Sequence, residues 1–233
     1  MSLGTQCWSM KIFCHIISVM ERLYKYDLSI HGVKRLDLQE QAPRMLPFEI
    51  MELPLHDIIR KITSPVEPGV YLQCKIELEH DHGMYQQLKP YINSFMRITS
   101  LPPPTNVMLR MGSCPQRILP HFDSADNYLL QLVGSKHVLL FDFDVDKVKK
   151  VEFMKDVQYL KMEGLKKELD RRGITYLEKV VKPNQFVHIK PGKFHYIENV
   201  ETTGHTASLN LYYEEDEAIA QDWIYAWHMG EQI

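Results

Sequence analysis

The sequence has few cysteines and no long apolar run, and these two absences exclude several classes of protein. Its four cysteines form no C-x-x-C pair and no zinc-type spacing, which favours free thiols in a reducing compartment inside the cell, the cytoplasm or the nucleus. The longest apolar stretch near the start, residues 12–20, is too short to span a bilayer and lacks the flanks of a signal peptide. We therefore expect a soluble, unsecreted protein without a membrane partner.

An excess of charge of one sign is also lacking. The chain holds 27 Lys and Arg against 30 Asp and Glu, a net charge of -3, so no general attraction to nucleic acid or to an anionic membrane is expected. No repeat and no linker rich in Pro, Gly or Ser divides the 233 residues. The sequence therefore predicts a single domain over residues 1–233 with one substantial core.

What the sequence does have is a series of short β-rich runs from residue 106 onward. The expected strands are Asn106–Met111, Tyr128–Val133, His137–Phe141, Phe186–Ile189, His195–Val200 and Thr206–Tyr213. Turns with Gly or Pro separate these runs, which is typical of a sandwich or barrel. The segment at about 146–173 is rich in Lys, Glu and Leu and ends at Gly173, which predicts a helical insertion. The predicted fold is mainly β, with a barrel over residues 106–213.

The segments on either side of the barrel are expected to be largely helical. Residues 1–105 are predicted as N-terminal helices, at 12–23, 55–62 and 84–95, with supporting strands such as 69–76. Pro90 must lie near the start of the third helix or kink it. Residues 214–233 predict a C-terminal helix that carries Trp223 and Trp227 one turn apart. These side chains either pack on the protein's own core or form a homodimer interface.

The triplet His121-Phe122-Asp123 is the first candidate for chemistry. On a strand, residues i and i+2 point to the same face, so His121 and Asp123 could hold one metal ion from one side. With one more distant histidine they would form the facial triad of two imidazoles and a carboxylate that suits Fe(II) and leaves coordination positions open. The ordinary alternative is a surface turn, because Pro120 precedes the triplet and small polar residues follow it.

Three further features add to this candidate, although each has an ordinary explanation. His195 follows a Pro191-Gly192 turn that would deliver it to the start of a strand, and the alternative is a core histidine. Lys136 begins an apolar strand and could project into a barrel, whereas most turn lysines are solvated. In the run 206–213, alternate residues are polar, and this face is either exposed to solvent or the lining of a pocket. The residues of that face are Thr206, Ser208, Asn210 and Tyr212.

In this order and spacing, these residues resemble the signature of the JmjC hydroxylases. The run from His121 through Asp123 and Lys136 to Phe141 resembles the first signature of the family, and residues 182–195 resemble the second. The run 206–213 is similar to the closing strand, with its Asn followed by aromatics. The resemblance covers about residues 106–213. It is strongest for small single-domain members, such as the asparaginyl hydroxylase that acts on hypoxia-inducible factor and the hydroxylase of wybutosine tRNA biosynthesis.

The resemblance implies a double-stranded β-helix, the jelly-roll barrel of cupin and JmjC proteins, with iron and co-substrate sites inside it. It makes His121, Asp123 and His195 the ligands of Fe(II). Lys136 would bind the distal carboxylate of 2-oxoglutarate. Asn127 and Asn210 match positions that hydrogen-bond the co-substrate or line its pocket. The implied reaction consumes O2 and 2-oxoglutarate, releases succinate and CO2, and hydroxylates a C–H bond of a protein side chain or a tRNA base.

The chain departs from the family at Ile118, where many relatives carry a Thr or Ser whose hydroxyl helps to bind the co-substrate carboxylate. An aromatic hydroxyl, from Tyr128 or Tyr212, is the candidate replacement. Two alternative functions stay open: a cupin-type metal enzyme that does not use 2-oxoglutarate, and a catalytically inactive JmjC binding module. Lys136 argues against the first of these, and the three metal-ligand residues argue against the second.

Overall fold

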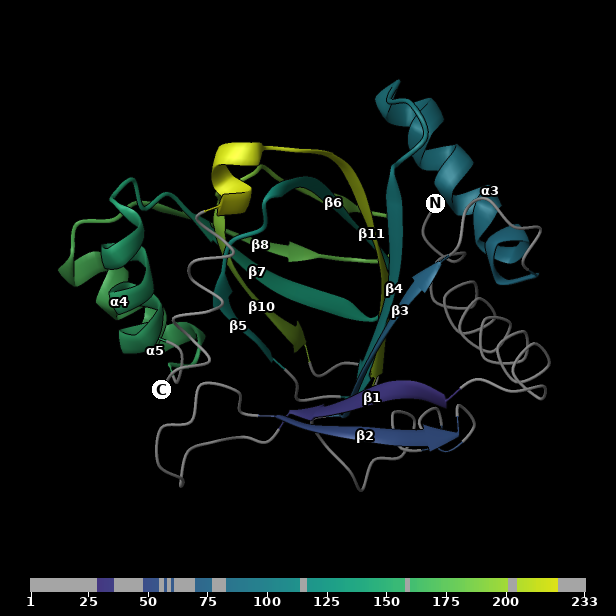
Figure 1. Ribbon diagram of the computed structural model, residues 1–233, viewed down its shortest axis with the longest axis horizontal. Helices are drawn as coiled ribbons and strands as arrows, with labels where there is room; N and C mark the ends of the chain where they lie inside the picture. Colours follow the sequence, from purple (N-terminus) through teal and green to yellow (C-terminus); the bar gives the residue numbers. More distant parts are fainter. Residues whose placement is uncertain are drawn as a thin grey trace, which may run out of the picture.

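The strands of this protein form two antiparallel sheets that face each other (Figure 1). The computed structural model describes residues 29–35, 48–54, 57, 60, 70–76, 83–113, 117–157, 160–200 and 205–221. The larger sheet has the strand order β2-β1-β3-β4-β11-β6-β9, and the smaller has the order β5-β10-β7-β8. Strands that are neighbours in space but distant in sequence, such as β4 and β11, are typical of a jelly roll.

The bounds of the elements follow the chain in this order. The strands are β1 (Ser29–Arg35), β2 (Phe48–Pro54), β3 (Val70–Ile76), β4 (Asn106–Ser113), β5 (Arg117–His121), β6 (Ala125–Val133), β7 (Ser135–Phe141), β8 (Tyr176–Val181), β9 (Phe186–Ile189), β10 (Phe194–Val200) and β11 (His205–Glu215). The helices are α3 (Gly83–Thr99), α4 (Lys147–Val157) and α5 (Met162–Arg171). Residues 217–221 begin a further helix.

The space between the two sheets has an apolar part and a polar part. The apolar part is one cluster of buried side chains from both sheets: Ile118, Leu129, Val138, Leu140, Val181, Val187, Ile189 and Ile197. Because side chains alternate along a strand, the residues two positions away from these also point inward. On β7 and β10 these inward positions include Lys136 and His195, which are both 2% exposed. On β11, Leu209 and Leu211 pack on the outer face, so Asn210 between them points inward, and it is 1% exposed. The fold therefore gathers polar groups inside the barrel.

The outer faces of the two sheets are covered by different helices. Helix α3 contributes Leu88, Ile92 and Phe95 to a cluster with the outward residues of β4, β6 and β11. Helices α4 and α5 contribute Phe153 and Leu165, among others, to a second cluster on the outward residues of β7 and β10. In Figure 1, α3 lies on one side of the barrel and α4 and α5 on the opposite side. Strands β4, β6 and β11 of the larger sheet and β7 and β10 of the smaller are thus covered on their outer faces.

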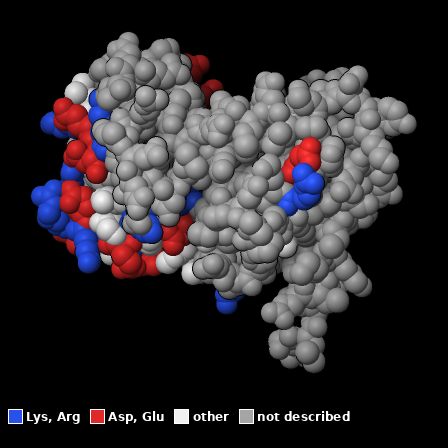
Figure 2. Space-filling model, turned by 90° about the horizontal axis from the view of Figure 1, so that it is seen from below, with Lys and Arg blue, Asp and Glu red and all other residues white. Residues whose placement is uncertain are grey.

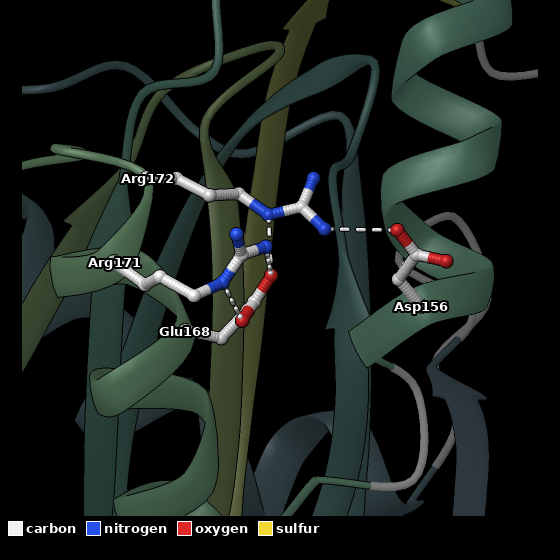
Figure 3. A network of polar contacts seen from close by, with 4 residues as sticks. All are labelled: Asp156, Glu168, Arg171 and Arg172. Atoms are coloured by element: carbon white, nitrogen blue, oxygen red, sulfur yellow. Dashed lines mark hydrogen bonds and ion pairs between the residues drawn. The ribbon is translucent and has the colours of Figure 1, made fainter.

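A network of charged side chains joins the two insertion helices (Figure 3). Arg172 donates hydrogen bonds to Glu168 of α5 at 2.6 Å and to Asp156 of α4 at 2.8 Å. Arg171 also donates to both oxygens of the Glu168 carboxylate. Arginine suits this role because its planar guanidinium can bridge two carboxylates at once. The insertion is held together by these contacts as well as by its apolar core.

The mainly β jelly-roll fold that the sequence predicts is confirmed. All six expected strands of the barrel are present, and so are the strand at 70–76 and the helix at 83–99. Pro90 lies inside α3 rather than near its start. The expected helix at 12–23 lies outside the described residues, and so do most of the helix at 55–62 and both Trp223 and Trp227. Among the described residues, no helix is long and apolar enough to cross a membrane.

Three details of the fold go beyond the sequence-based expectation. The helical insertion consists of two helices, since α4 ends at Val157 and α5 begins at Met162. Strands β1 and β2 extend the larger sheet beyond the predicted strand β3. Neither these two strands nor β5 and β8 were predicted individually. Pro120 lowers the strand propensity of β5, and most residues of β8 are exposed at the edge of the smaller sheet, so it lacks an apolar alternation.

Candidate metal centre

His195 is delivered to the interior by a tight turn before β10. Gly192 in this turn has a φ of +71°, a left-handed conformation that favours glycine. A Cβ at this position would lie 3.0 Å from Ile219. The N–H of Gly192 donates to the backbone oxygen of Asp123 at 2.9 Å, so the turn is fastened to the loop that carries the carboxylate.

His121 is the last residue of β5, and an irregularity in the strand pairing sets its position. His121 pairs with His195 on β10, whereas Ile118 pairs with Ile197, so two residues of β5 lie opposite one residue of β10. The extra residue is accommodated next to Pro120, which has no N–H to donate to the ladder. Such a bulge re-aims the side chain that follows it. Asp123 lies beyond the end of the strand, in the loop to β6. The expectation that His121 and Asp123 share one strand is therefore wrong, and the loop brings the carboxylate back to the imidazole.

The three predicted ligand residues lie together. One donor atom from each of His121, Asp123 and His195 lies within 4.8 Å of the other two. The Nε2 atoms of His121 and His195 are 3.7 and 3.8 Å from the two carboxylate oxygens of Asp123. Two donors that are each about 2.1 Å from one metal ion are roughly 3–4 Å apart. The donor set of two nitrogens and one oxygen is that of the facial triad and fits a divalent transition metal such as Fe(II).

The surroundings of His195 and Asp123 shift the pKa values of both groups in the directions that favour binding of a metal cation. Burial of the His195 imidazole lowers its pKa, although Asp123 acts in the opposite direction, so the ring is neutral at neutral pH. Its Nδ1–H donates to the backbone oxygen of Lys193 at 3.1 Å, which leaves the Nε2 lone pair for a metal. Burial alone would raise the pKa of Asp123, but His195, His121, Arg110 and the Asn127 amide together lower it. The carboxylate is therefore ionised.

Two asparagines connect this cluster to the larger sheet. The side-chain N–H of Asn127 on β6 donates to the Asp123 carboxylate at 2.8 Å. The side-chain N–H of Asn210 on β11 donates to the Asn127 carbonyl oxygen at 3.0 Å. Both side chains are 1% exposed. The two residues that the resemblance assigned to the pocket thus form a chain that orients the carboxylate.

Lys136 lies deeper in the barrel. Its ammonium donates to the side-chain oxygen of Asn199 at 2.9 Å, and Asn199 donates to the backbone oxygen of Ser113. Asn199 is four residues beyond His195 on β10, roughly 13 Å along the strand. Lys136 is thus buried in the barrel, and its binding of a co-substrate carboxylate stays a prediction. A buried ammonium is suited to a carboxylate.

Between Lys136 and the triad, several buried polar atoms have no hydrogen-bond partner among the described residues. These are Oε1 of Gln131, Oγ1 of Thr206, Oγ of Ser208 and Oδ1 of Asn210. Thr206, Ser208 and Asn210 are at most 1% exposed, so the alternative of a solvated outer face is excluded for them. Buried polar atoms are nearly always satisfied by protein, water or a ligand. The interior is thus suited to a small polar molecule with several oxygen atoms.

This chain has Ile118 where many members of the resembled family have Thr or Ser, and two tyrosines were the candidates for supplying the missing hydroxyl. The structure gives different outcomes for them. Tyr128 points away from the barrel interior and packs against Phe95, Phe186 and Tyr213, with its ring stacked on His188 at 4.2 Å. Its assignment to the co-substrate pocket is therefore wrong, because neighbouring residues on β6 alternate between the two faces. Tyr212, on the inward face of β11, accepts a hydrogen bond from Arg110 at 2.8 Å. Ile118 is 5% exposed within the apolar cluster.

Arg110 is an inward cation that the sequence-based reasoning missed. It pairs with Ser208 across β4 and β11, and its charge acts on both Asp123 and His195. The signal was present in the sequence, because Arg110 is the one charged residue in the otherwise apolar run Asn106–Met111. Without the pairing of β4 and β11, however, the direction of its side chain was not determined.

Comparisons with solved structures agree with this fold. The chain is similar to YcfD, a ribosomal oxygenase from Escherichia coli, in complex with cobalt and 2-oxoglutarate, at 13% identity and a TM-score of 0.50. The match covers 93% of this chain and 48% of that one. Another structure of YcfD is 12% identical with a TM-score of 0.49, covering 94% of this chain and 50% of that one. The cupin domain of Drosophila melanogaster CENP-C is 9% identical with a TM-score of 0.31, covering 46% and 59% of the two chains.

The first of these likenesses shows that the two chains share a fold. The chain spans about half the length of the YcfD chains that it matches. No family model matches the sequence, and no curated protein is similar to it at a significant level.

Proposed function

We propose that this protein is an Fe(II)- and 2-oxoglutarate-dependent oxygenase that hydroxylates a C–H bond of a protein side chain or a tRNA base. The observation that carries the proposal is the placement of His121, Asp123 and His195 in one jelly-roll interior with the buried cation Lys136. A metal triad alone fits many cupin-type enzymes. A lysine at the inner end of the same pocket adds the partner that a dicarboxylate co-substrate requires.

Each inward side chain has a role in this proposal. The two imidazoles and the carboxylate hold the metal ion, and Asn127 keeps the Asp123 carboxylate in position. Lys136 binds the distal carboxylate of 2-oxoglutarate, and Asn210 and the buried hydroxyls of Thr206 and Ser208 donate to its oxygens. These hydroxyls stand in for the one that Ile118 lacks. The assignment gives an acceptor to the buried hydroxyls of Thr206 and Ser208, whereas the unpartnered amide oxygens of Gln131 and Asn210 are acceptors themselves and need a donor such as water.

The proposed reaction combines a substrate C–H bond, O2 and 2-oxoglutarate to give an alcohol, succinate and CO2. One oxygen atom of O2 enters the new hydroxyl group and the other enters the new carboxylate of succinate. The iron, when bound, supplies the activation of oxygen, and the protein orients the co-substrate and excludes water. The apolar cluster around Ile118, Val138 and Ile197 provides the dry wall that this exclusion needs.

The experiment that tests the proposal is an anaerobic titration of the Fe(II)-loaded protein with 2-oxoglutarate. Chelation of Fe(II) by the keto acid produces a weak visible charge-transfer band. We expect the band in the wild type, its loss in His121→Ala, and a weaker affinity for 2-oxoglutarate in Lys136→Ala. Val180→Ala on β8 is the control, because Val180 is 41% exposed and pairs with His137, on the face of the sheet that points away from the barrel interior.

Three results would contradict the proposal or one of its assignments. Bound iron without a band would favour the alternative of a cupin-type metal enzyme that does not use 2-oxoglutarate. Failure to bind metal would favour a catalytically inactive module, and the apolar packing of Ile118 is the observation in favour of that alternative. An unchanged band in Lys136→Ala would show that the co-substrate carboxylate is held elsewhere.

The remaining assignments are part of the same proposal. We infer a macromolecular substrate, a protein or a tRNA, and an intracellular location in the cytoplasm or nucleus. The finer resemblance to the asparaginyl hydroxylase and to the wybutosine hydroxylase rests on the sequence motifs alone. A homodimer through Trp223 and Trp227 is a separate proposal, which light scattering at several protein concentrations tests.

A further inference from the structure

A second cation, Arg110, lies at the metal end of the barrel, far from Lys136. Its side chain points inward from β4, since it pairs with Ser208, and its Nη2 donates to the Tyr212 hydroxyl at 2.8 Å. Tyr212 pairs with Asn127, the residue whose amide donates to the Asp123 carboxylate. The guanidinium therefore extends towards the end of the barrel that holds the triad, whereas Lys136 contacts Asn199, which lies roughly 13 Å along β10 from His195.

A cation at this place has an electrostatic consequence. The guanidinium of Arg110 is positively charged at all physiological pH values, so it disfavours a divalent metal ion held nearby by His195 and Asp123. An anion bound between the guanidinium and the metal would remove this repulsion, because it attracts both.

The chemistry of Arg110 and Tyr212 indicates which anion would bind there. A guanidinium presents its N–H groups in a planar fork that matches the two oxygens of a carboxylate. The phenolic hydroxyl beside it is a further donor. Both residues are neither fully buried nor fully exposed, so a group on an incoming substrate can reach them.

We propose that Arg110 and Tyr212 form a second carboxylate site at the mouth of the pocket, which selects an acidic peptide side chain as the substrate. This inference rests on the proposed function and names its substrate class. It makes Arg110 a specificity-determining residue rather than a ligand of the co-substrate.

A peptide carboxylate fits the described surface better than a nucleic-acid phosphate does. A nucleic-acid substrate calls for a basic face beside the pocket. On the helical insertion, basic side chains are instead paired with acidic ones, as in Lys149–Asp146, Lys166–Glu178 and Arg172–Asp156. Figure 2 shows this alternation of blue and red residues at the left of the molecule.

The test uses the full chain loaded with Co(II) and saturated with 2-oxoglutarate, a form in which binding can be measured without turnover. Blocked pentapeptides that differ only in a central aspartate, glutamate, asparagine, glutamine or lysine are titrated by calorimetry and by the visible spectrum of Co(II). We expect the acidic peptides to bind about tenfold more tightly than their amide counterparts. In Arg110→Gln the preference should shrink to within about twofold, and Arg110→Lys should restore part of it.

Several outcomes would overturn the inference. One is equal binding of acidic and amide peptides, or binding of none, by the wild type. Another is a preference for acids that survives Arg110→Gln. A raised Kd for 2-oxoglutarate in Arg110→Gln, with the acid preference intact, would assign Arg110 to the co-substrate. Arg110-dependent binding of a single-stranded oligonucleotide, without binding of acidic peptides, would assign it to a phosphate.

Two controls keep the result interpretable. If Arg110→Gln does not fold, as judged by circular dichroism, Tyr212→Phe decides the matter, and a smaller loss of the acid preference is expected there. Failure of the wild type to bind 2-oxoglutarate would overturn the proposed function together with this inference. Intact 2-oxoglutarate binding without any preference for acids would overturn this inference alone.

Discussion

A single buried amide, that of Asn127, orients the carboxylate of the candidate metal centre. It donates to Asp123 and accepts from Asn210, so it fixes the direction of the ligand from the opposite sheet. We expect Asn127→Ala to weaken Co(II) binding by about ten- to a hundredfold, the usual effect of losing a partner of a ligand. Competition with a coloured chelator measures this affinity.

Asn199→Ala is the matched control for this prediction, because it also removes a buried asparagine. Asn199 contacts Lys136 rather than the metal ligands. It should therefore weaken 2-oxoglutarate binding and leave the Co(II) affinity unchanged. Equal effects of the two substitutions on Co(II) would mean that Asn127 has only a general structural role.

Tyr128 offers a test of which face of β6 carries the chemistry. Its ring packs under α3 against Phe95, and the pocket lies on the other side of the strand. Tyr128→Phe should leave the Kd for 2-oxoglutarate within about twofold of the wild type. Tyr128→Ala should instead lower the free energy of unfolding by about 2 kcal/mol, because a half-buried ring is lost. A large rise of the Kd in Tyr128→Phe, measured by the same absorbance titration, would contradict this arrangement.

The sequence predicted which residues converge better than it predicted which way the side chains point. The sequence carries the information on convergence, because His121 and Asp123 are two residues apart and because Lys136 and His195 follow turns at Gly134 and Gly192 that can be recognised locally. The direction of Tyr128 and Arg110 depends on the register between strands that are distant in sequence. No local pattern specifies that register, and these are the two residues for which the expectation failed or was absent.

At the scale of elements, the contact between α4 and α5 depends on pH. Hydrogen bonds from Arg171 and then Arg172 lower the pKa of Glu168 from 4.5 to about 2. A carboxyl whose pKa is lowered by folding stabilises the folded state above its unfolded pKa. That contribution is lost as the pH falls from about 4.5 towards 2. Glu168→Gln should therefore lower the Tm at pH 7 but not at pH 2.

The matched control is Glu163→Gln on the same helix. Glu163 is 76% exposed and its contact with Lys166 is long, at 3.3 Å, so its removal should change the Tm little at either pH. Thermal unfolding followed by circular dichroism at the two pH values makes the comparison. A Tm difference between Glu168→Gln and the wild type that persists at pH 2 would contradict the assigned role of the carboxylate.

Strands and helices with a clear pattern of apolar residues were predicted from the sequence. Elements that are stabilised mainly by pairing with a neighbouring strand were not. The continuous apolar run of β7 is visible in the sequence because the strand packs on both of its faces, and β11 alternates because its inward residues are polar and its outward residues are apolar. Strand β8 carries exposed residues such as Leu177 and Val180 and is held mainly by its pairing with β7. Such an edge strand is specified by its neighbour, so the local sequence contains little signal for it.

At the scale of the whole molecule, metal binding should couple to folding. The ligands come from two segments that are far apart in the chain, and only the folded barrel brings them together. Co(II) at about 100 times its Kd should stabilise the folded state by roughly 2.7 kcal/mol. We expect the Tm to rise with Co(II) and to return on addition of a chelator. His195→Ala should abolish the shift, and a rise of equal size in that variant would point to a different binding site.

The pairing of His195 with His121 has a consequence for how the barrel is assembled. The two residues are direct neighbours across β10 and β5, next to the bulge at Pro120. If β10 were displaced by one residue along β5, His195 would face the opposite side of the sheet and could not share an ion with His121. A transition metal would thus bind the native strand alignment and not the shifted one. During synthesis of the chain, the availability of the ion would then act as a quality control on the folding of the barrel.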